Sequence, residues 1–205
     1  AAVTPSANNS APAATPKPAP APIKIGGVTI FGSLRLRAES WDWFDPDSAY
    51  DDSYTFGAAV LRLGLGRRKE KYEWQIEGEF PALIGLPERA VAPAPQGQLG
   101  PGASYFAASG RQDATAIFKQ GFIRFKETFG DKASSLKLGR FEFNDGLEVI
   151  PANPTLAVVK RDHISQRFIG AFGFTHIGRS FDGLQYSRNA KAGNFTFFGA
   201  RPTEG

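Results

Sequence analysis

Polar and apolar side chains alternate along most of this chain with a period of two residues rather than 3.6. The clearest segment is 71–80, in which tyrosine, tryptophan, isoleucine and phenylalanine alternate with lysine, glutamates and glutamine. A period of two is typical of a β-strand whose two faces meet different surroundings. The pattern predicts about seven strands of roughly ten residues, the length that a tilted strand needs to cross a bilayer. The predicted strands are residues 28–43, 54–67, 71–80, 117–126, 135–143, 181–188 and 194–201.

The connections between these strands alternate in length. Short polar turns at 67–71, 128–134 and 189–193 alternate with longer links at 44–53, 81–115 and 144–178. Outer-membrane barrels have this order, because their periplasmic turns are short and their extracellular loops are long. The fold class predicted is therefore all-β, an antiparallel up-and-down transmembrane β-barrel. Within 135–143 the alternation breaks near Gly139, where we expect a β-bulge.

A β-barrel in lipid has to close on itself, since each unpaired backbone group there costs several kcal/mol. Bacterial single-chain barrels use an even number of strands, whereas about seven are predicted here. We therefore expect 27–205 to be the N-terminal part of a longer barrel, present as an incomplete fragment. Residues 1–26 are rich in alanine and proline and have few large apolar side chains, so we expect a disordered periplasmic leader.

Aromatic side chains gather where the predicted strands meet the membrane surface. Outer-membrane barrels carry such rings as girdles at both interfaces. The predicted girdle consists of Trp41, Trp43, Tyr54, Trp74 and Phe80.

Composition and motifs exclude several functions. The net charge of +4 does not indicate nucleic-acid binding, and the absence of cysteine excludes disulfides and thiolate metal sites. The two histidines, His163 and His176, have no ligand partners at metal-binding spacing, so no metal or cofactor is expected. Aspartates in 42–52 could hold Ca²⁺, but the spacing is not that of an EF-hand and a solvated acidic loop is favoured. No nucleophile elbow, phosphate loop or zinc helix motif is present, so we expect no enzyme activity.

Three segments resemble the alginate export porins: 138–148 (LGRFEFNDGLE), 160–162 (KRD) and 172–183 (FGFTHIGRSFDG). The resemblance extends over nearly all of the chain from about Gly27 onward. It implies an eighteen-stranded outer-membrane barrel with a basic lumen that conducts a polyanionic uronate chain. The glutamates of 71–80 depart from a uniformly basic lumen.

The polar strand faces supply the candidate pore-lining residues. Arginine and lysine there would attract an anion, and a guanidinium matches a carboxylate with two parallel hydrogen bonds. The candidates are Arg35, Arg37, Arg62, Arg124, Lys126, Lys137 and Arg140. An alternative is that these cations pair with Glu39, Glu73, Glu77 and Glu79 on neighbouring strands and stiffen the wall.

The long link 144–178 contains a stretch with helical spacing, 155–169. It is a candidate constriction loop that would present Lys160, Arg161 and Arg167 in the lumen. The alternative is a surface loop packed on its neighbours.

The function expected is an outer-membrane porin of a bacterial cell that passes an anionic solute, with an acidic polysaccharide such as alginate first and a small anion second. Its partners would be this solute, outer-membrane lipid and lipopolysaccharide, without nucleic acid. The alternative from another class is a soluble or surface carbohydrate-binding β-sandwich, which would use Trp41, Trp43 and Trp74 as stacking platforms.

Overall fold

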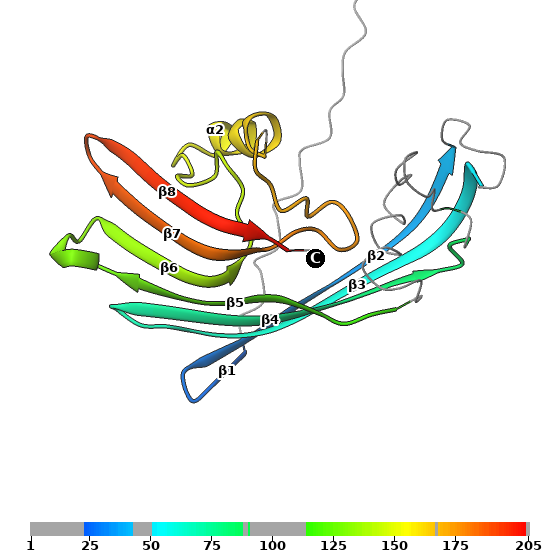
Figure 1. The fold of residues 1–205 in the computed structure, drawn as a ribbon, viewed down its shortest axis with the longest axis horizontal. Coiled ribbons are helices and arrows are strands. Elements are labelled where there is room, and N and C mark those ends of the chain that lie inside the picture. Colours follow the sequence, from blue (N-terminus) through cyan, green and yellow to red (C-terminus); the bar gives the residue numbers. More distant parts are fainter. Residues whose placement is uncertain (1–22, 43–50, 88–89, 91–113, 167, 204–205) are drawn as a thin grey trace, which may run out of the picture.

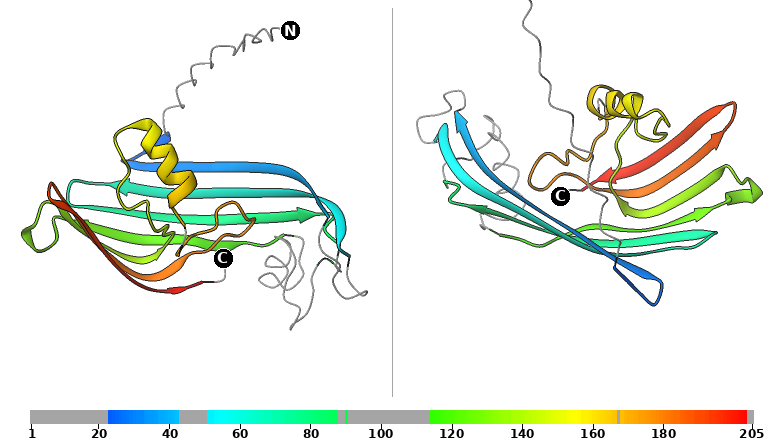
Figure 2. Two further views of the ribbon diagram at one scale, coloured as in Figure 1. Left: turned by 90° about the horizontal axis from the view of Figure 1, so that it is seen from above. Right: turned by 180° about the vertical axis from the view of Figure 1, so that it is seen from behind.

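The computed structural model describes residues 23–42, 51–87, 90, 114–166 and 168–203. They form one eight-stranded antiparallel sheet in which every strand pairs with the next along the chain (Figure 1). The sheet curves into a trough and does not close on itself (Figure 2). The strands are β1 (Ile23–Ile25), β2 (Val28–Asp42), β3 (Ser53–Arg68), β4 (Tyr72–Ile84), β5 (Ile117–Lys126), β6 (Ser134–Phe141), β7 (Phe181–Ala190) and β8 (Gly193–Pro202).

The strands β2 to β8 confirm the seven predicted segments and their up-and-down order. The sequence pattern missed only β1, which pairs with the start of β2 across a turn at Gly26 and Gly27. Both glycines have positive φ, at 56° and 80°, a conformation that other residues rarely adopt. The sheet thus begins at Ile23, inside the range 1–26 that we expected to be leader.

In the described part of the sheet, the register shifts between β4 and β5, at Glu77 and Gly78. Gln120 pairs with Glu77 and Phe118 pairs with Gly78, so Lys119 has no partner residue on β4. The bulge expected near Gly139 was wrong, because β5 and β6 stay in continuous register through that glycine. Successive side chains of β6 keep alternating between the two faces there. On the convex face the residue type changes from apolar Leu138 to charged Arg140.

The convex face of the sheet is exposed, and most of its side chains are apolar. Its large hydrophobic side chains keep between 36% and 68% of their surface accessible, and within the described ranges no second layer covers them (Figure 2). They come from every strand between β2 and β8: Leu34, Leu36, Leu63, Leu65, Ile76, Phe80, Phe118, Phe125, Leu138, Leu184, Phe195 and Phe197. The face is unusual for a water-soluble sheet, which normally buries its apolar side.

The concave face carries the buried residues and the long link between β6 and β7. One apolar cluster joins Tyr54, Phe56 and Leu83 to Ile177 of the link. A second cluster is built on Phe141, Phe143 and Phe181. These clusters hold the link against the sheet.

Within the link, a short helix, α2 (Pro154–Val159), continues into a π-helical turn, η3 (Lys160–Ile164), over the open side of the trough (Figure 1). Asn153 caps α2 by accepting from the backbone N–H groups of Thr155 and Leu156. A short 3-10 turn, η2 (Thr128–Gly130), connects β5 and β6. No helix in the described ranges has the length and apolar character that a membrane-spanning helix requires.

Candidate functional site on the concave face

A cluster of charged side chains occupies the middle of the concave face, and we name it the central cluster: Arg62, Glu77, Glu79, Lys119 and Glu142. Arg62 Nε lies 2.5 Å from Glu79, and its two terminal nitrogens reach Glu142 at 3.0 and 3.4 Å. Lys119 Nζ lies 3.7 Å from both Glu79 and Glu142. Two cations therefore face three carboxylates, so this cluster has no surplus positive charge for a ligand.

Register explains how the central cluster assembles. Arg62 and Glu79 are direct partners across β3 and β4, with their side chains on the same face. The bulge in β5 then turns Lys119 toward this face beside Gln120, and the lysine side chain is fully buried. A buried ammonium needs such carboxylates, because an unpaired charge in the interior is costly.

A second set of charges crosses the sheet nearer its short turns, and we name it the basic row: Arg68, Glu73, Arg124, Lys126 and Lys137. In register, Glu73 stands between Arg68 and Arg124, and Arg124 is next to Lys137. Glu73 pairs with Arg124 at 2.6 Å, Arg68 at 3.0 Å and Lys126 at 3.7 Å. One carboxylate thus serves three cations, and positive charge is in excess here.

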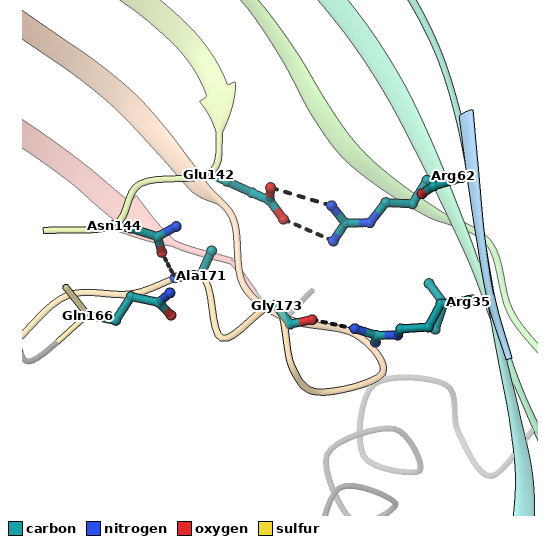
Figure 3. Close-up of a pocket in the computed structure, with 9 residues that line it drawn as sticks. Arg35, Arg62, Glu142, Asn144, Gln166, Ala171 and Gly173 are labelled. Atoms are coloured by element: carbon teal, nitrogen blue, oxygen red, sulfur yellow. Dashed lines mark hydrogen bonds and ion pairs between the residues drawn. The ribbon is translucent and has the colours of Figure 1, made fainter. Parts of the chain in front are cut away.

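Residues 171–180, which we name the inward loop, contact strands β2 and β5 on the concave face. Arg35 donates to the carbonyl oxygen of Gly173 at 2.6 Å and also to that of Thr175. Arg37 donates to the carbonyl of Phe174 at 2.7 Å, and Lys119 donates to that of Ile177. Together with the apolar contacts of Ile177, cations of the concave face therefore hold this loop inward; the Arg35–Gly173 bond is drawn in Figure 3.

His176 anchors the tip of the inward loop and is 1% exposed. Its Nε2 lies 3.1 Å from a carboxylate oxygen of Glu39, and its Nδ1 lies 3.4 Å from Arg37. Glu39 also accepts from the indole nitrogen of Trp41 at 2.9 Å. Burial lowers the pKa of His176 below its usual value, and Glu39 opposes that shift only in part. The imidazole is consequently neutral at pH 7.

Two cavities open between the sheet and the β6–β7 link. The first has a volume of about 260 Å³ and lies between Arg35 and Arg62 on one side and Asn144 and Gln166 on the other (Figure 3). The second has a volume of about 240 Å³ and is lined by Arg124, Lys137, Glu142, Phe143, Asn144, Leu147, Glu148 and Gln185. Polar side chains of the strands face both cavities.

Six of the seven predicted pore-lining cations share the concave face, and Arg140 lies on the convex face. Alternation continues unbroken through β6, so Arg140 is on the side of Leu138 and its register partner is Asp182. Its guanidinium binds that carboxylate at 2.7 Å. Of the other cations, Arg37, Arg62, Arg124 and Lys126 make ion pairs with glutamates, as the alternative expects. Arg35 and Lys137 make no ion pair with described residues, and their pore-lining role stays a prediction.

The residues predicted as an aromatic girdle divide between the two faces. Trp41 and Tyr54 belong to the concave apolar cluster. Trp41 lies an even number of residues from Arg35 along β2, so both side chains are on the concave face, and Tyr54 is the register partner of Trp41. Trp74 and Phe80 are in register with convex residues of β3. Trp43 lies outside the described residues.

The candidate constriction residues do not form the part of the link that binds the wall. Lys160 donates to the carbonyl of Val149 at 2.7 Å, and Arg161 pairs with its exposed neighbour Asp162 at 2.6 Å. Arg167 lies outside the described residues. The inward loop, further along the chain, is the segment that the wall cations hold.

Sequence reasoning missed Lys119, Glu142 and the role of His176. Lys119 has the wrong parity for the concave face until the bulge is known. The Phe118-Lys119-Gln120 run does interrupt the alternation and was the available hint.

Among the described residues, no group of three or more His, Asp and Glu side chains is arranged to hold a metal ion. Asp45 and Asp47 of the acidic loop lie outside the described residues. Comparison with protein-family models, with curated proteins and with solved structures gave no match.

Proposed function

We propose that this chain forms part of the wall of an outer-membrane β-barrel porin that passes an anionic solute, with an acidic polysaccharide of the alginate type as the expected cargo. One observation carries the proposal. A single curved sheet has large exposed apolar side chains over its convex face and charged side chains over its concave face. In water such a face would be an aggregation surface, whereas in a bilayer it is the side that faces lipid.

Strand lengths and connections support the same arrangement. The strands β2, β3 and β4 contain 15, 16 and 13 residues, which is enough for a tilted strand to cross the hydrocarbon layer. The long links leave one end of the sheet and the short turns leave the other. Under this proposal the long links are extracellular, and additional strands complete the barrel beyond β8, which pairs only with β7 among the described strands.

Charge on the concave face supports an anion as the solute. The basic row has more cations than carboxylates, and Arg35 meets only backbone carbonyls in the described part of the chain. Cations that are separated along a wall bind a polyanion weakly and repeatedly, which transport requires. The inward loop narrows the passage and occupies the donors of Arg35 and Arg37 until it moves.

The carbohydrate-binding sandwich gains no comparable support. Trp41 lies on the concave face within an apolar cluster, while Trp74 pairs in register with the convex side. These rings cannot form one stacking platform. A sandwich also needs a second sheet over the apolar face, and the described residues place none there.

The proposal is tested with the full-length protein in planar bilayers under a salt gradient. We expect channels whose reversal potential favours anions, and Arg124→Gln should shift that potential toward cations. Lys191→Gln is the matched control, because it removes the same charge from the short turn between β7 and β8. Absence of channels, or cation selectivity in the unaltered protein, would overturn the proposal.

A further inference from the structure

The side chain of Lys137 is largely buried, and its ammonium, which faces a cavity, makes no ion pair within the described part of the chain. Its side chain belongs to a residue that is 8% exposed, and it lines the second cavity. Its Nζ stands 4.8 Å from the ring centre of Phe122 and 4.5 Å from that of Phe141, without a hydrogen bond or ion pair to any described residue. Aromatic faces recover only part of what burial of an ammonium costs. The site therefore lacks a counter-ion.

Glu73 does not fill that role, although it lies on the same face. Arg124 separates it from Lys137 in the register of β4, β5 and β6. Glu73 is also shared among Arg68, Arg124 and Lys126. Glu73 thus acts on Lys137 only from a distance and makes its ion pairs with the other three cations of the row.

The remaining wall of the cavity limits which anion fits. Asn144 uses its carbonyl oxygen to accept from the N–H of Ala171 at 2.7 Å, which leaves its amide hydrogens for another acceptor. Gln185 uses its amide nitrogen to donate to Ser187 at 3.1 Å, which leaves its oxygen for another donor. One donor and one acceptor of this kind suit hydroxyl groups.

Carboxylates on the same wall disfavour a ligand with two negative charges. Glu142 belongs to the central cluster, and Glu148 lines the cavity from the link after β6. A ligand with one charge can place it at Lys137 and keep uncharged groups near Glu148. A dianion would bring like charges together.

We propose that this cavity is a binding subsite for one carboxylate of a singly charged, hydroxyl-rich ligand, a sugar acid, with Lys137 as its counter-ion. The subsite rests on the proposed function for its place in the passage. It goes further by assigning the residue that binds the carboxylate and by predicting discrimination against dianions such as phosphate.

Titration calorimetry on the full-length protein in detergent tests the subsite, with sodium glucuronate, glucose and inorganic phosphate as probes. We expect glucuronate to bind more tightly than glucose or phosphate. Lys137→Gln should weaken glucuronate binding about ten- to hundredfold, the range for loss of a charge-assisted hydrogen bond. Lys137→Arg should keep binding within a few fold. Lys132→Gln, which removes a charge from the exposed β5–β6 turn, should leave the affinity unchanged.

Glu148→Gln provides a second variant that does not alter the lysine. It should narrow the preference for glucuronate over phosphate, because it removes a negative charge from the wall. Equal glucuronate affinity in Lys137→Gln and the unaltered protein, or no binding at all, would overturn the subsite. That result would leave the channel recordings intact, whereas a protein that binds glucuronate through Lys137 but forms no channels would overturn the porin alone.

Discussion

An arginine in place of Leu36 tests whether the convex face meets lipid or water. Leu36 sits in the middle of β2, opposite Ala59, and is 68% exposed. On a surface in water, a substitution at so exposed a position changes stability by about 0.5 kcal/mol or less. At the midplane of a bilayer, an outward-facing arginine on a β-barrel costs about 2–4 kcal/mol. The two settings therefore predict clearly different results.

Ser40→Arg is the matched control, because Ser40 lies on the same strand and face, four residues nearer the long link. Four residues advance about 13 Å along a strand, which is roughly 9 Å of depth at a 45° tilt. The cost of arginine falls to about 0–1 kcal/mol near the interface. Leu36→Ala and Ser40→Ala provide the reference for each position.

The assay is guanidinium unfolding of the full-length protein from lipid vesicles, followed by tryptophan fluorescence. A cost of 2–4 kcal/mol corresponds to a change of roughly 30- to 900-fold in the folding equilibrium. Leu36→Arg should show this loss and Ser40→Arg should show little. Equal and small effects at both positions would refute the reasoning, since a face in water has no depth dependence.

Three further predictions concern the concave face. Replacing Arg35 and Arg37 together by glutamine should raise channel conductance and speed hydrogen exchange in the inward loop, because their donors hold its carbonyl groups; unchanged values would contradict that latch. His176 faces Glu39, Arg37 and Arg35, and its pKa is lowered, so the docked inward loop binds fewer protons than the released loop. Docking should therefore be strongest above about pH 6.5 and weaken as pH falls below it. In hydrogen-exchange measurements His176→Gln should remove this pH dependence. Glu79→Ala should cost roughly 3–5 kcal/mol in urea unfolding, since it breaks a buried ion-pair cluster, and a loss below 1 kcal/mol would contradict the burial.

Alternation was sufficient to predict the strands because each long strand meets unlike surroundings on its two sides over many residues. Every one of the seven from β2 to β8 was located to within a few residues of its observed bounds. Strand β1 was missed because Ile23–Ile25 offers a single alternation, which cannot be distinguished from a coil.

The site was predicted less completely, for reasons of packing. Parity along a strand placed Arg35, Arg37 and Lys137 on one face, and the same rule would have put Trp41 there and Arg140 on the other side. Parity could not foresee that Lys119 is turned inward by a bulge. Contacts made by the inward loop join residues about 140 positions apart, so only the folded chain reveals them.

The central claim is that one face of the sheet meets lipid and the other meets water. The chain has no cysteine, so a single introduced cysteine can be labelled at each of four consecutive positions in β7: Leu184, Gln185, Tyr186 and Ser187. In lipid vesicles, labels at Leu184 and Tyr186 should be quenched by a quencher attached to the acyl chains, and labels at Gln185 and Ser187 by a water-soluble quencher. Quenching of all four only by the water-soluble reagent would contradict the account.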